Sequence, residues 1–278
     1  MKGKLIVIGA IIVVLLGCSI LAYPTVMRTI SSESASILVE RNVQKATKFT
    51  KEEQEAEFEK AREFNEKIFD SCEMKQAMQC YYDILDYDDG IMGSIEIPSI
   101  GVNLPIYHSV DDQSIRKGIG HYEYSSLPIG EINTHSVFTS HTGLPEASLL
   151  TDLHKMKIGD RFFVTIMNVT TEYVVEAIDV VTPEEIGNIV PIEGKCCVSL
   201  FTCTPYGINS HRLVVRGVLV DQYEDVETNT FISETITDID SKIQKRNAII
   251  IASVAVLFAI AIVAVIIIRK HKARENIL

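Results

Sequence analysis

The sequence is poor in cysteine, has no excess of positive charge and contains no tryptophan. Its 278 residues include 26 Lys and Arg against 37 Asp and Glu, which gives a formal net charge of −11. Proteins that bind nucleic acid neutralise phosphates with clustered Lys and Arg, so this charge balance argues against a nucleic-acid partner. Hydrophobic residues make up 47% of the chain, which suits a folded protein.

The scarcity of cysteine limits two structural roles. The six cysteines are Cys18, Cys72, Cys80, Cys196, Cys197 and Cys203. Five cysteines outside the first apolar run are too few for a disulfide scaffold in an extracellular protein of this size. No CxxC pair and no Cys/His cluster has the spacing of zinc ligands, so we expect no structural metal. Nothing in the sequence indicates a cofactor.

Long apolar runs are few, and the two that are present lie near the ends of the chain. Residues 5–22 and 248–268 are uncharged, and each is close to the ~20 residues that a helix needs to cross a membrane. Basic residues favour the cytoplasmic side; Lys2 and Lys4 precede the first run, and RKHKAR follows the second. This predicts a cell-membrane protein with two cytoplasmic termini and with residues 24–246 outside the cell.

Two other interpretations of the first run stay open. Lysines precede its apolar core, as in a cleaved signal peptide, although no Ala-x-Ala stands before Tyr23. The residues LLGC that end at Cys18 resemble a bacterial lipoprotein box with a lipidated cysteine, although Leu16 is large for its position. We prefer an uncleaved anchor, and either alternative leaves the central region outside the cell and bound to the membrane.

The chain changes character between the two apolar runs. Residues 51–69 are rich in helix formers and have apolar residues at steps of three and four, which predicts an amphipathic helix. Residues 70–92 lose that pattern and end in the turn-like DYDDG, so we expect a mobile segment. Residues 221–241 are acidic and have no strong period, which indicates a solvated linker.

From residue 93 the apolar period becomes two, which predicts short strands. The expected strands are residues 94–98, 102–108, 119–122, 135–141, 161–167, 172–181, 197–203 and 212–220. Helical turns fit residues 112–117 and 146–150. Many short strands separated by Gly, Pro and Asn predict a mainly β fold, either a closed barrel or a sandwich, and residues 93–220 suffice for one core.

The cysteine that ends one of these strands is a candidate nucleophile. A nucleophilic cysteine acts as its thiolate and needs a partly exposed, electropositive setting. Cys203 ends the strand 197–203, and Arg212 begins the next, so antiparallel pairing brings the two side by side. An arginine there can donate hydrogen bonds to an oxyanion. Without further information, a free cysteine in an apolar strand is more often a buried small residue.

Composition cannot choose the histidine that would serve as acid and base. His211 would point to the face opposite Arg212, and His271 lies beyond the second apolar run. The candidates are His108, His121, His135, His141, His154 and His211.

The stretch VSLFTCTPYGINSHRLVVRG strongly resembles the active-site segment of the sortases. It is closest to the class C sortases, which polymerise pilins and have a pattern near T-L-x-T-C-T-P-Y-G-x-N-x-H-R-L-x-V-R-G. Two further stretches, GSIEIPSIGVNLPIYHSV and GIGHYEYSSLPIGEINTHSVFTSHTGLPEASLLTDLHKMKIGD, resemble the first half of the same family. The resemblance spans roughly residues 51–220, in order and with matching gaps.

This resemblance implies a fold, an activity and a site. The fold is a closed eight-stranded sortase-type β-barrel with short helices, preceded by a helical neck and flanked by two transmembrane helices. The site consists of His141 in the stretch SHTGLP, the nucleophile Cys203 and the arginine Arg212. The implied activity is that of a membrane-bound cysteine transpeptidase that cleaves an LPxTG-like sorting signal between Thr and Gly. The acyl group then passes to a Lys amine of a pilin subunit, without a cofactor.

The domain boundaries follow from these patterns. We predict an N-terminal anchor (residues 1–23), a helical neck with a lid region (24–92) and the barrel domain (93–220). An acidic linker (221–247), a second transmembrane helix (248–268) and a basic cytoplasmic tail (269–278) follow.

Two other functions are weighed against pilin polymerisation. A housekeeping sortase would use an amine of a peptidoglycan precursor instead of a pilin lysine. An inactive sortase-like module would bind sorting signals without cleaving them, and the presence of Cys203, His141 and Arg212 argues against it.

The sequence departs from the class C pattern in a few places. Small or loop changes occur at Ser125, Glu131, Ser140 and Ser199. A larger departure is that class C sortases usually carry an Asp-Pro-aromatic lid before the first strand, and residues 70–92 contain no such tripeptide.

The missing tripeptide leaves open how the site is covered. Either the lid is absent, or Cys72, Met74 or Tyr81 covers the site in another way. Cys72 and Cys80 form a disulfide only if the segment is a loop, because one helix would hold them about 12 Å apart.

Overall fold

The structure is a computed structural model, and it describes residues 2–70 and 72–224. The chain divides into two units, of which residues 30–228 form one. The described part of the other unit is the start of helix α1. The acidic linker beyond residue 224, the second apolar helix predicted at residues 248–268 and the basic tail at 269–278 lie outside the described residues.

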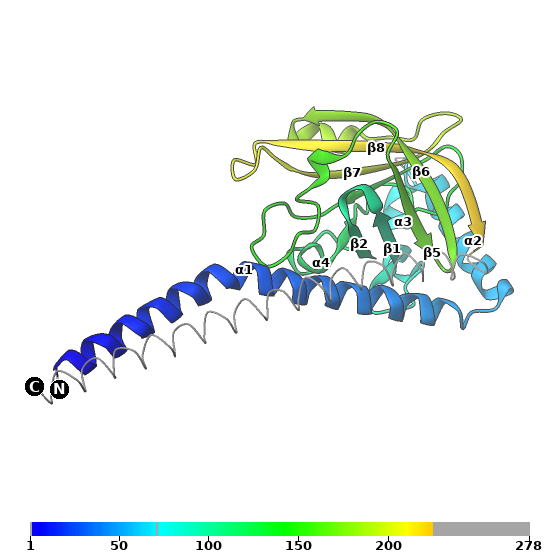
Figure 1. Cartoon of the computed structure of the whole chain (residues 1–278). Helices are drawn as coiled ribbons and strands as arrows, with labels where there is room; N and C mark the ends of the chain where they lie inside the picture. The colour runs from blue at the N-terminus through cyan, green and yellow to red at the C-terminus, as the bar shows by residue number, and fades with distance from the viewer. Residues whose placement is uncertain (1, 71, 225–278) are drawn as a thin grey trace, which may run out of the picture. The chain divides into compact units, whose positions relative to one another are not determined.

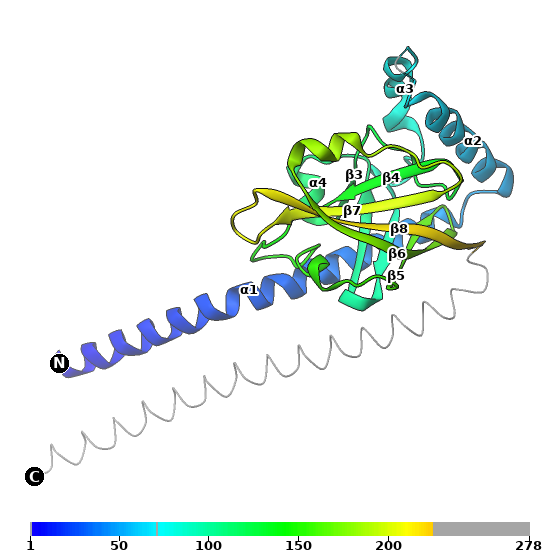
Figure 2. The ribbon, with the colours of Figure 1, turned by 90° about the horizontal axis from the view of Figure 1, so that it is seen from above.

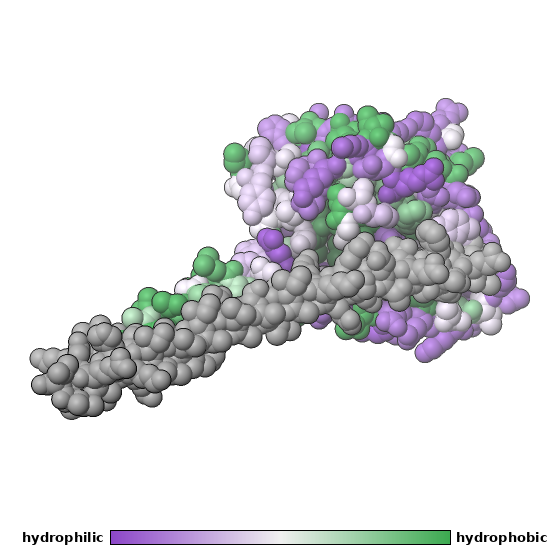
Figure 3. Space-filling view, viewed as in Figure 1, coloured by the Kyte–Doolittle hydropathy of each residue, from purple (hydrophilic) through white to green (hydrophobic). Residues whose placement is uncertain are grey.

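Helix α1 (Lys2–Ala46) contains the first apolar run and is much longer than that run. It passes through Pro24 without ending and continues to Ala46, which the sequence pattern did not predict. Its part from Gly9 to Ala46 is long and apolar enough to cross a membrane. Large apolar side chains such as Ile20 and Leu21 are exposed along it, and Figure 3 shows the coloured part of this helix as mostly hydrophobic.

Eight strands close into a barrel in the order β1, β2, β3, β4, β7, β8, β6, β5 (Figures 1 and 2). Their bounds are Ile91–Ile97 (β1), Val102–Tyr107 (β2), Ile119–His121 (β3), Thr134–Thr139 (β4), Arg161–Ile166 (β5), Val169–Val181 (β6), Cys196–Thr204 (β7) and His211–Glu224 (β8). The closed eight-stranded barrel is therefore confirmed, and the sandwich is wrong. Strand ends lie within three residues of the predicted ones, except that β8 continues to Glu224.

The barrel closes around side chains that alternate along the strands. On β7 the inward residues Val198 and Leu200 belong to the hydrophobic core. Phe162 of β5 stacks on Tyr173 of β6, with ring centroids 5.3 Å apart. Gly217 of β8 lies against the Phe162 ring. A Cβ atom at position 217 would come within 2.4 Å of that ring. Any larger residue at this position would displace the aromatic pair.

Short helices connect the strands. Helix α4 (Asp112–Lys117) has the bounds that the sequence predicted. The helical turn expected at residues 146–150 is wrong, because these residues form bends and turns and a 3₁₀ helix follows at Leu153–Lys155. Other 3₁₀ helices lie at Pro98–Ile100 and Pro183–Asn188.

Helix α2 (Lys51–Lys67) confirms the predicted amphipathic helix. Thr50 and Glu53 form a capping box at its start, which satisfies two backbone N–H groups at the N-terminus. Its buried residues are Phe58, Ala61 and Phe64, and all three belong to the hydrophobic core.

Residues 72–92 are folded and packed, although we expected a mobile segment over residues 70–92. They contain helix α3 (Met74–Cys80) and a 3₁₀ helix at Tyr81–Asp83. The Tyr81 side chain is fully buried, and its hydroxyl lies 2.8 Å from the carbonyl oxygen of His108 and 2.6 Å from Nδ1 of His121. The sequence misled here because the contacts that order this segment come from the barrel rather than from a local apolar period.

Replacing Tyr81 by phenylalanine is expected to destabilise the protein by about 1–2 kcal/mol, because the buried partners of the hydroxyl lose a hydrogen bond. The matched control is Tyr82→Phe, since the Tyr82 hydroxyl bonds an exposed carboxylate, Glu123, at 2.9 Å. We expect that control to change stability little. Thermal unfolding of the detergent-solubilised protein measures both, and equal midpoints for the two variants would contradict the structural role of Tyr81.

The second half of α1 is held to the barrel by a buried carboxylate. Asp88 has no exposed side-chain surface, and it accepts hydrogen bonds from Arg41 and Lys45. The amide of Asn42 also donates to the carbonyl of Ile91 at the start of β1. A buried carboxylate is stable only when it is paired, so these contacts fix residues 30–46 of the helix against the barrel.

Candidate active site

Cys203 and Arg212 face each other across two neighbouring strands. β7 and β8 are antiparallel, and Cys203 is the direct ladder partner of Arg212. This confirms the pairing that the turn length predicted. Cys203 lies on the face of β7 opposite to the one that carries the core residues Val198 and Leu200. Its thiol is free and partly exposed, as a nucleophile requires.

His141 follows the end of β4, the strand next to the one that carries Cys203. β4 runs parallel to β7, and Thr139 pairs with Phe201, an offset of 62 residues (201 − 139). His141 and Cys203 have the same offset (203 − 141) and lie two residues beyond this last pair. Neighbouring strands lie about 4.8 Å apart, so the ends of β4 and β7 bring the two residues to the same edge of the barrel.

Hydroxyl groups tie the ends of these two strands together. The Thr202 hydroxyl donates to the carbonyl oxygen of Ser140 at 3.0 Å, and the Thr139 hydroxyl donates to that of Phe201 at 3.1 Å. These bonds join the residues immediately before Cys203 and His141. Both candidate residues are therefore carried by a rigid frame, although neither belongs to the core.

The Arg212 side chain is anchored to the β7–β8 turn. Its Nη1 donates to the carbonyl oxygens of Asn209 at 3.1 Å and His211 at 3.0 Å. In the part of the chain that the structure describes, Nε and Nη2 have no hydrogen-bond partner. A guanidinium has five N–H donors, so several remain for a bound carbonyl or oxyanion.

An aromatic ring joins the loops that follow Cys203 and His141. Tyr206 lies in the β7–β8 turn, and its hydroxyl is 3.4 Å from the carbonyl oxygen of Gly143. Gly143 has a positive φ of 80°, and a Cβ on it would come within 2.6 Å of the Tyr206 ring. Only glycine fits both conditions at this position. The sequence motif contains both residues but does not reveal this contact.

A second pair of cysteine and histidine lies deeper in the barrel wall. His135 of β4 pairs with Cys197 of β7, next to Cys196. Both cysteines are buried, as predicted, and burial raises the pKa of both thiols, that of Cys197 to about 11. The His135 ring is held by the Val190 carbonyl at 3.0 Å and the Ser199 hydroxyl at 2.8 Å. These thiols would be poor nucleophiles at neutral pH, so Cys203 is the better candidate.

Helices α2 and α3 do not lie over this site. Figures 1 and 2 both show α2 and α3 well apart from the β7–β8 turn. The Tyr81 hydroxyl forms hydrogen bonds with His108 and His121, and the Met74 side chain packs against the core. Cys72 and Cys80 are both free thiols, so they form no disulfide.

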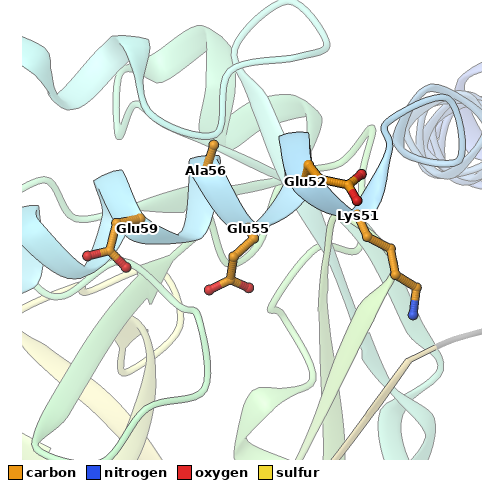
Figure 4. Close-up of a pocket in the computed structure, with 5 residues that line it drawn as sticks. All are labelled: Lys51, Glu52, Glu55, Ala56 and Glu59. Atoms are coloured by element: carbon orange, nitrogen blue, oxygen red, sulfur yellow. The ribbon is translucent and has the colours of Figure 1, made fainter.

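A hollow of about 570 Å³ lies along helix α2 and is unrelated to this chemistry (Figure 4). Its lining residues are Lys51, Glu52, Glu55, Ala56 and Glu59. They include no cysteine, serine or histidine, and they belong to α2, which lies apart from the β7–β8 turn in Figure 2.

Comparisons with known proteins agree with this architecture. The model of the sortase domain family matches residues 95–220. Sortase C1 from Streptococcus agalactiae is 37% identical, with 66% of this chain and 97% of that chain covered and a TM-score of 0.62. Sortase C from Clostridium perfringens SM101 is 35% identical, with 66% and 98% covered and a TM-score of 0.57. Sortase A from Bacillus anthracis is 28% identical over 64% of this chain and 79% of that protein.

The closed eight-stranded barrel is the fold of a sortase-type protein. The chain belongs to the sortase family, and the structures that it resembles are mainly class C sortases. Sortases are cysteine transpeptidases, and this chain is an enzyme of that type.

Proposed function

We propose that Cys203, His141 and Arg212 form the active site of a transpeptidase that cleaves an LPxTG-like sorting signal between Thr and Gly. The observation that carries this proposal is the geometry of three neighbouring strands. The pairing of β4 with β7 ends at Thr139 and Phe201, two residues before His141 and Cys203, and Arg212 is the ladder partner of Cys203. A structure of C. perfringens sortase C with the C-terminal cell wall sorting motif supports the substrate class.

The reaction that these three residues would perform has two halves. The Cys203 thiolate attacks the Thr carbonyl, the carbonyl π electrons move onto oxygen, and Arg212 stabilises the resulting oxyanion. The Thr–Gly C–N bond then breaks, and His141 gives a proton to the departing Gly amine, which leaves a thioester on Cys203. In the second half, an amine attacks the thioester, the C–S bond breaks, and the proton of the amine returns to His141.

The amine that resolves the thioester decides the biological role. We propose a Lys side chain of a pilin subunit, because the relatives with 32–46% identity are class C sortases. The alternative is an amine of a peptidoglycan precursor, as in a housekeeping sortase. Two relatives named sortase A, at 28% and 29% identity, support that alternative.

Membrane attachment fits either acceptor. The apolar part of α1 would anchor the enzyme in the cell membrane, with the barrel outside the cell and the N-terminus in the cytoplasm. A tethered enzyme and a tethered substrate share one two-dimensional layer, which raises their effective concentration. The second transmembrane helix and a cytoplasmic C-terminus remain part of this proposal.

Intact-mass spectrometry of the full chain in detergent tests the proposal. After incubation with an LPxTG peptide, the wild-type protein is expected to gain the mass of the peptide fragment that ends at Thr. Cys203→Ala is expected to gain none, and Cys197→Ala is expected to behave like the wild type. Peptide binding without any adduct on wild type would instead support an inactive binding module.

The acceptor is identified in a second step. Adding a pilin-derived lysine peptide or a peptidoglycan-type amine to the acyl-enzyme should release a new amide with one of them. Transfer to the peptidoglycan-type amine alone would favour the housekeeping role.

A further inference from the structure

Helix α4 brings a carboxylate into contact with His141. Oδ1 of Asp112 lies 3.2 Å from Nε2 of His141, although the two residues are 29 positions apart in the chain. The other oxygen, Oδ2, accepts a hydrogen bond from Nε of Arg116 at 2.7 Å. This bond is the main reason that the pKa of the Asp112 carboxyl lies below its ordinary value. Asp112 is therefore ionised at neutral pH.

Helix α4 is short, but it is restrained at both ends. At its start, Asp111 accepts hydrogen bonds from the backbone N–H groups of Gln113 and Ser114. At its end, the hydroxyl of Ser140 lies 3.0 Å from the carbonyl oxygen of Ile115 and 2.7 Å from that of Gly118. Ser140 immediately precedes His141, so the helix that carries Asp112 is attached to the same stretch of backbone as the histidine.

A third restraint joins α4 to the loop that follows His141. Nη1 of Arg116 lies 3.0 Å from Oε1 of Glu146. Arg116 thus bridges Asp112 and Glu146, and the exposed carboxylate of Asp112 is held by a guanidinium instead of moving freely. Only Asp112 of these two acidic residues contacts the imidazole.

The contact determines how the imidazole is presented. A carboxylate only accepts hydrogen bonds, so Nε2 of His141 must carry a proton when the two groups are bonded. Nδ1 then remains as the nitrogen that can exchange a proton with substrate. A base oriented by a third group in this way is a general arrangement of nucleophilic catalysis.

We propose that Asp112 is a positioning residue for His141, fixing the imidazole so that Nδ1 exchanges the proton of the leaving and entering amines. The inference rests on the proposed function of His141 and adds a fourth residue to the site. The other charged or titratable groups on the elements around His141 include Asp111, Arg116 and Lys117 of α4 and its cap, Glu146 of the following loop, and Cys203, Tyr206, His211 and Arg212 of β7, β8 and their turn.

Kinetics of three variants test this role with a fluorescence-quenched LPxTG peptide. Loss of the fully buried aspartate of a serine protease lowers kcat about 10⁴-fold, and because Asp112 is exposed we expect about a tenfold loss for Asp112→Asn. KM should change little. Asp112→Glu should restore most of kcat, since it keeps the carboxylate. Glu146→Gln, which weakens one restraint on Arg116 but leaves the contact between Asp112 and the imidazole, should cost much less of kcat than Asp112→Asn. Equal losses of kcat in Asp112→Asn and Glu146→Gln, or a kcat that Asp112→Glu does not restore, would overturn the proposal.

A measurement without substrate separates failure of this inference from failure of the proposed function. Carbon-13 relaxation of the His141 ring should show greater ring motion in Asp112→Asn than in wild type or Glu146→Gln. A ring that stays equally ordered in all three proteins overturns the positioning role. If the ring loosens but wild type forms no thioester on Cys203, it is the proposed function that fails.

Discussion

Replacing His141 by alanine is expected to lower kcat for cleavage of an LPxTG peptide by about 10²–10⁴-fold, the usual contribution of a general acid and base. The fold should be unaffected, because the His141 side chain is 28% exposed and its one hydrogen-bond partner among the described residues is Asp112, itself on the surface. Steady-state kinetics measure the loss, and the thermal midpoint of the same preparation shows whether the barrel is intact.

The matched control for this variant is His154→Ala. His154 lies in the same connection between β4 and β5, and its Nδ1 is 3.1 Å from the carbonyl oxygen of Thr151. His154 has the same imidazole side chain but is exposed. We expect His154→Ala to keep activity within about twofold of wild type, as for most surface substitutions. If His141→Ala kept more than a tenth of the activity, the proton donor would have to be another group, and His135 would be the next histidine to test.

The strands could be predicted from the sequence because their signal is local, whereas the choice of a closed barrel came from the family resemblance. Several strands alternate apolar and polar residues, and the turns between strands contain Gly, Pro or Asn. The parts that could not be predicted depend on distant contacts. Tyr81 is ordered by His108 and His121 of the barrel, and Asp88 by Arg41 and Lys45 of α1.

The candidate site could be predicted only in part from the sequence. An eight-residue turn between two strands predicts that Arg212 returns to Cys203, and the ladder confirms this pairing. His141 could not be chosen from six histidines without the family resemblance. The parallel pairing of β4 with β7 cannot be predicted from the residues of either strand. Asp112 was predicted only as the start of a helical turn, since its contact with His141 depends on how α4 folds back toward β4.

The missing Asp-Pro-aromatic tripeptide has a structural counterpart. Helices α2 and α3 lie apart from the β7–β8 turn, so they do not cover the candidate site (Figure 2). The ring that does approach the site is Tyr206, which lies against Gly143. Access of peptide to Cys203 therefore depends on the loops after β4 and β7 rather than on the neck of the protein.

Replacing Arg212 by lysine is expected to lower kcat/KM for the LPxTG peptide by about 10²-fold, similar to the loss of one oxyanion donor in other acyl-transfer enzymes. Lysine keeps the positive charge but replaces a planar fork of donors with a single ammonium group. It would also lose the paired contacts of Nη1 with the Asn209 and His211 carbonyls, which orient the side chain at the turn. Rates of acyl-enzyme formation, followed by intact mass, measure the effect on the first half of the reaction.

The control is Arg216→Lys, four residues further along the same face of β8. Arg216 bonds Glu176 at 2.9 Å and is the ladder partner of Ser199, so it makes an ion pair but lies away from Cys203. We expect this variant to form acyl-enzyme at nearly the wild-type rate. If Arg212→Lys did the same, charge alone would suffice beside Cys203, and directed hydrogen bonds to the oxyanion would have to come from elsewhere, such as backbone N–H groups of the turn. A loss confined to Arg212→Lys would instead mean that the guanidinium geometry set by the β7–β8 ladder is what stabilises the transition state.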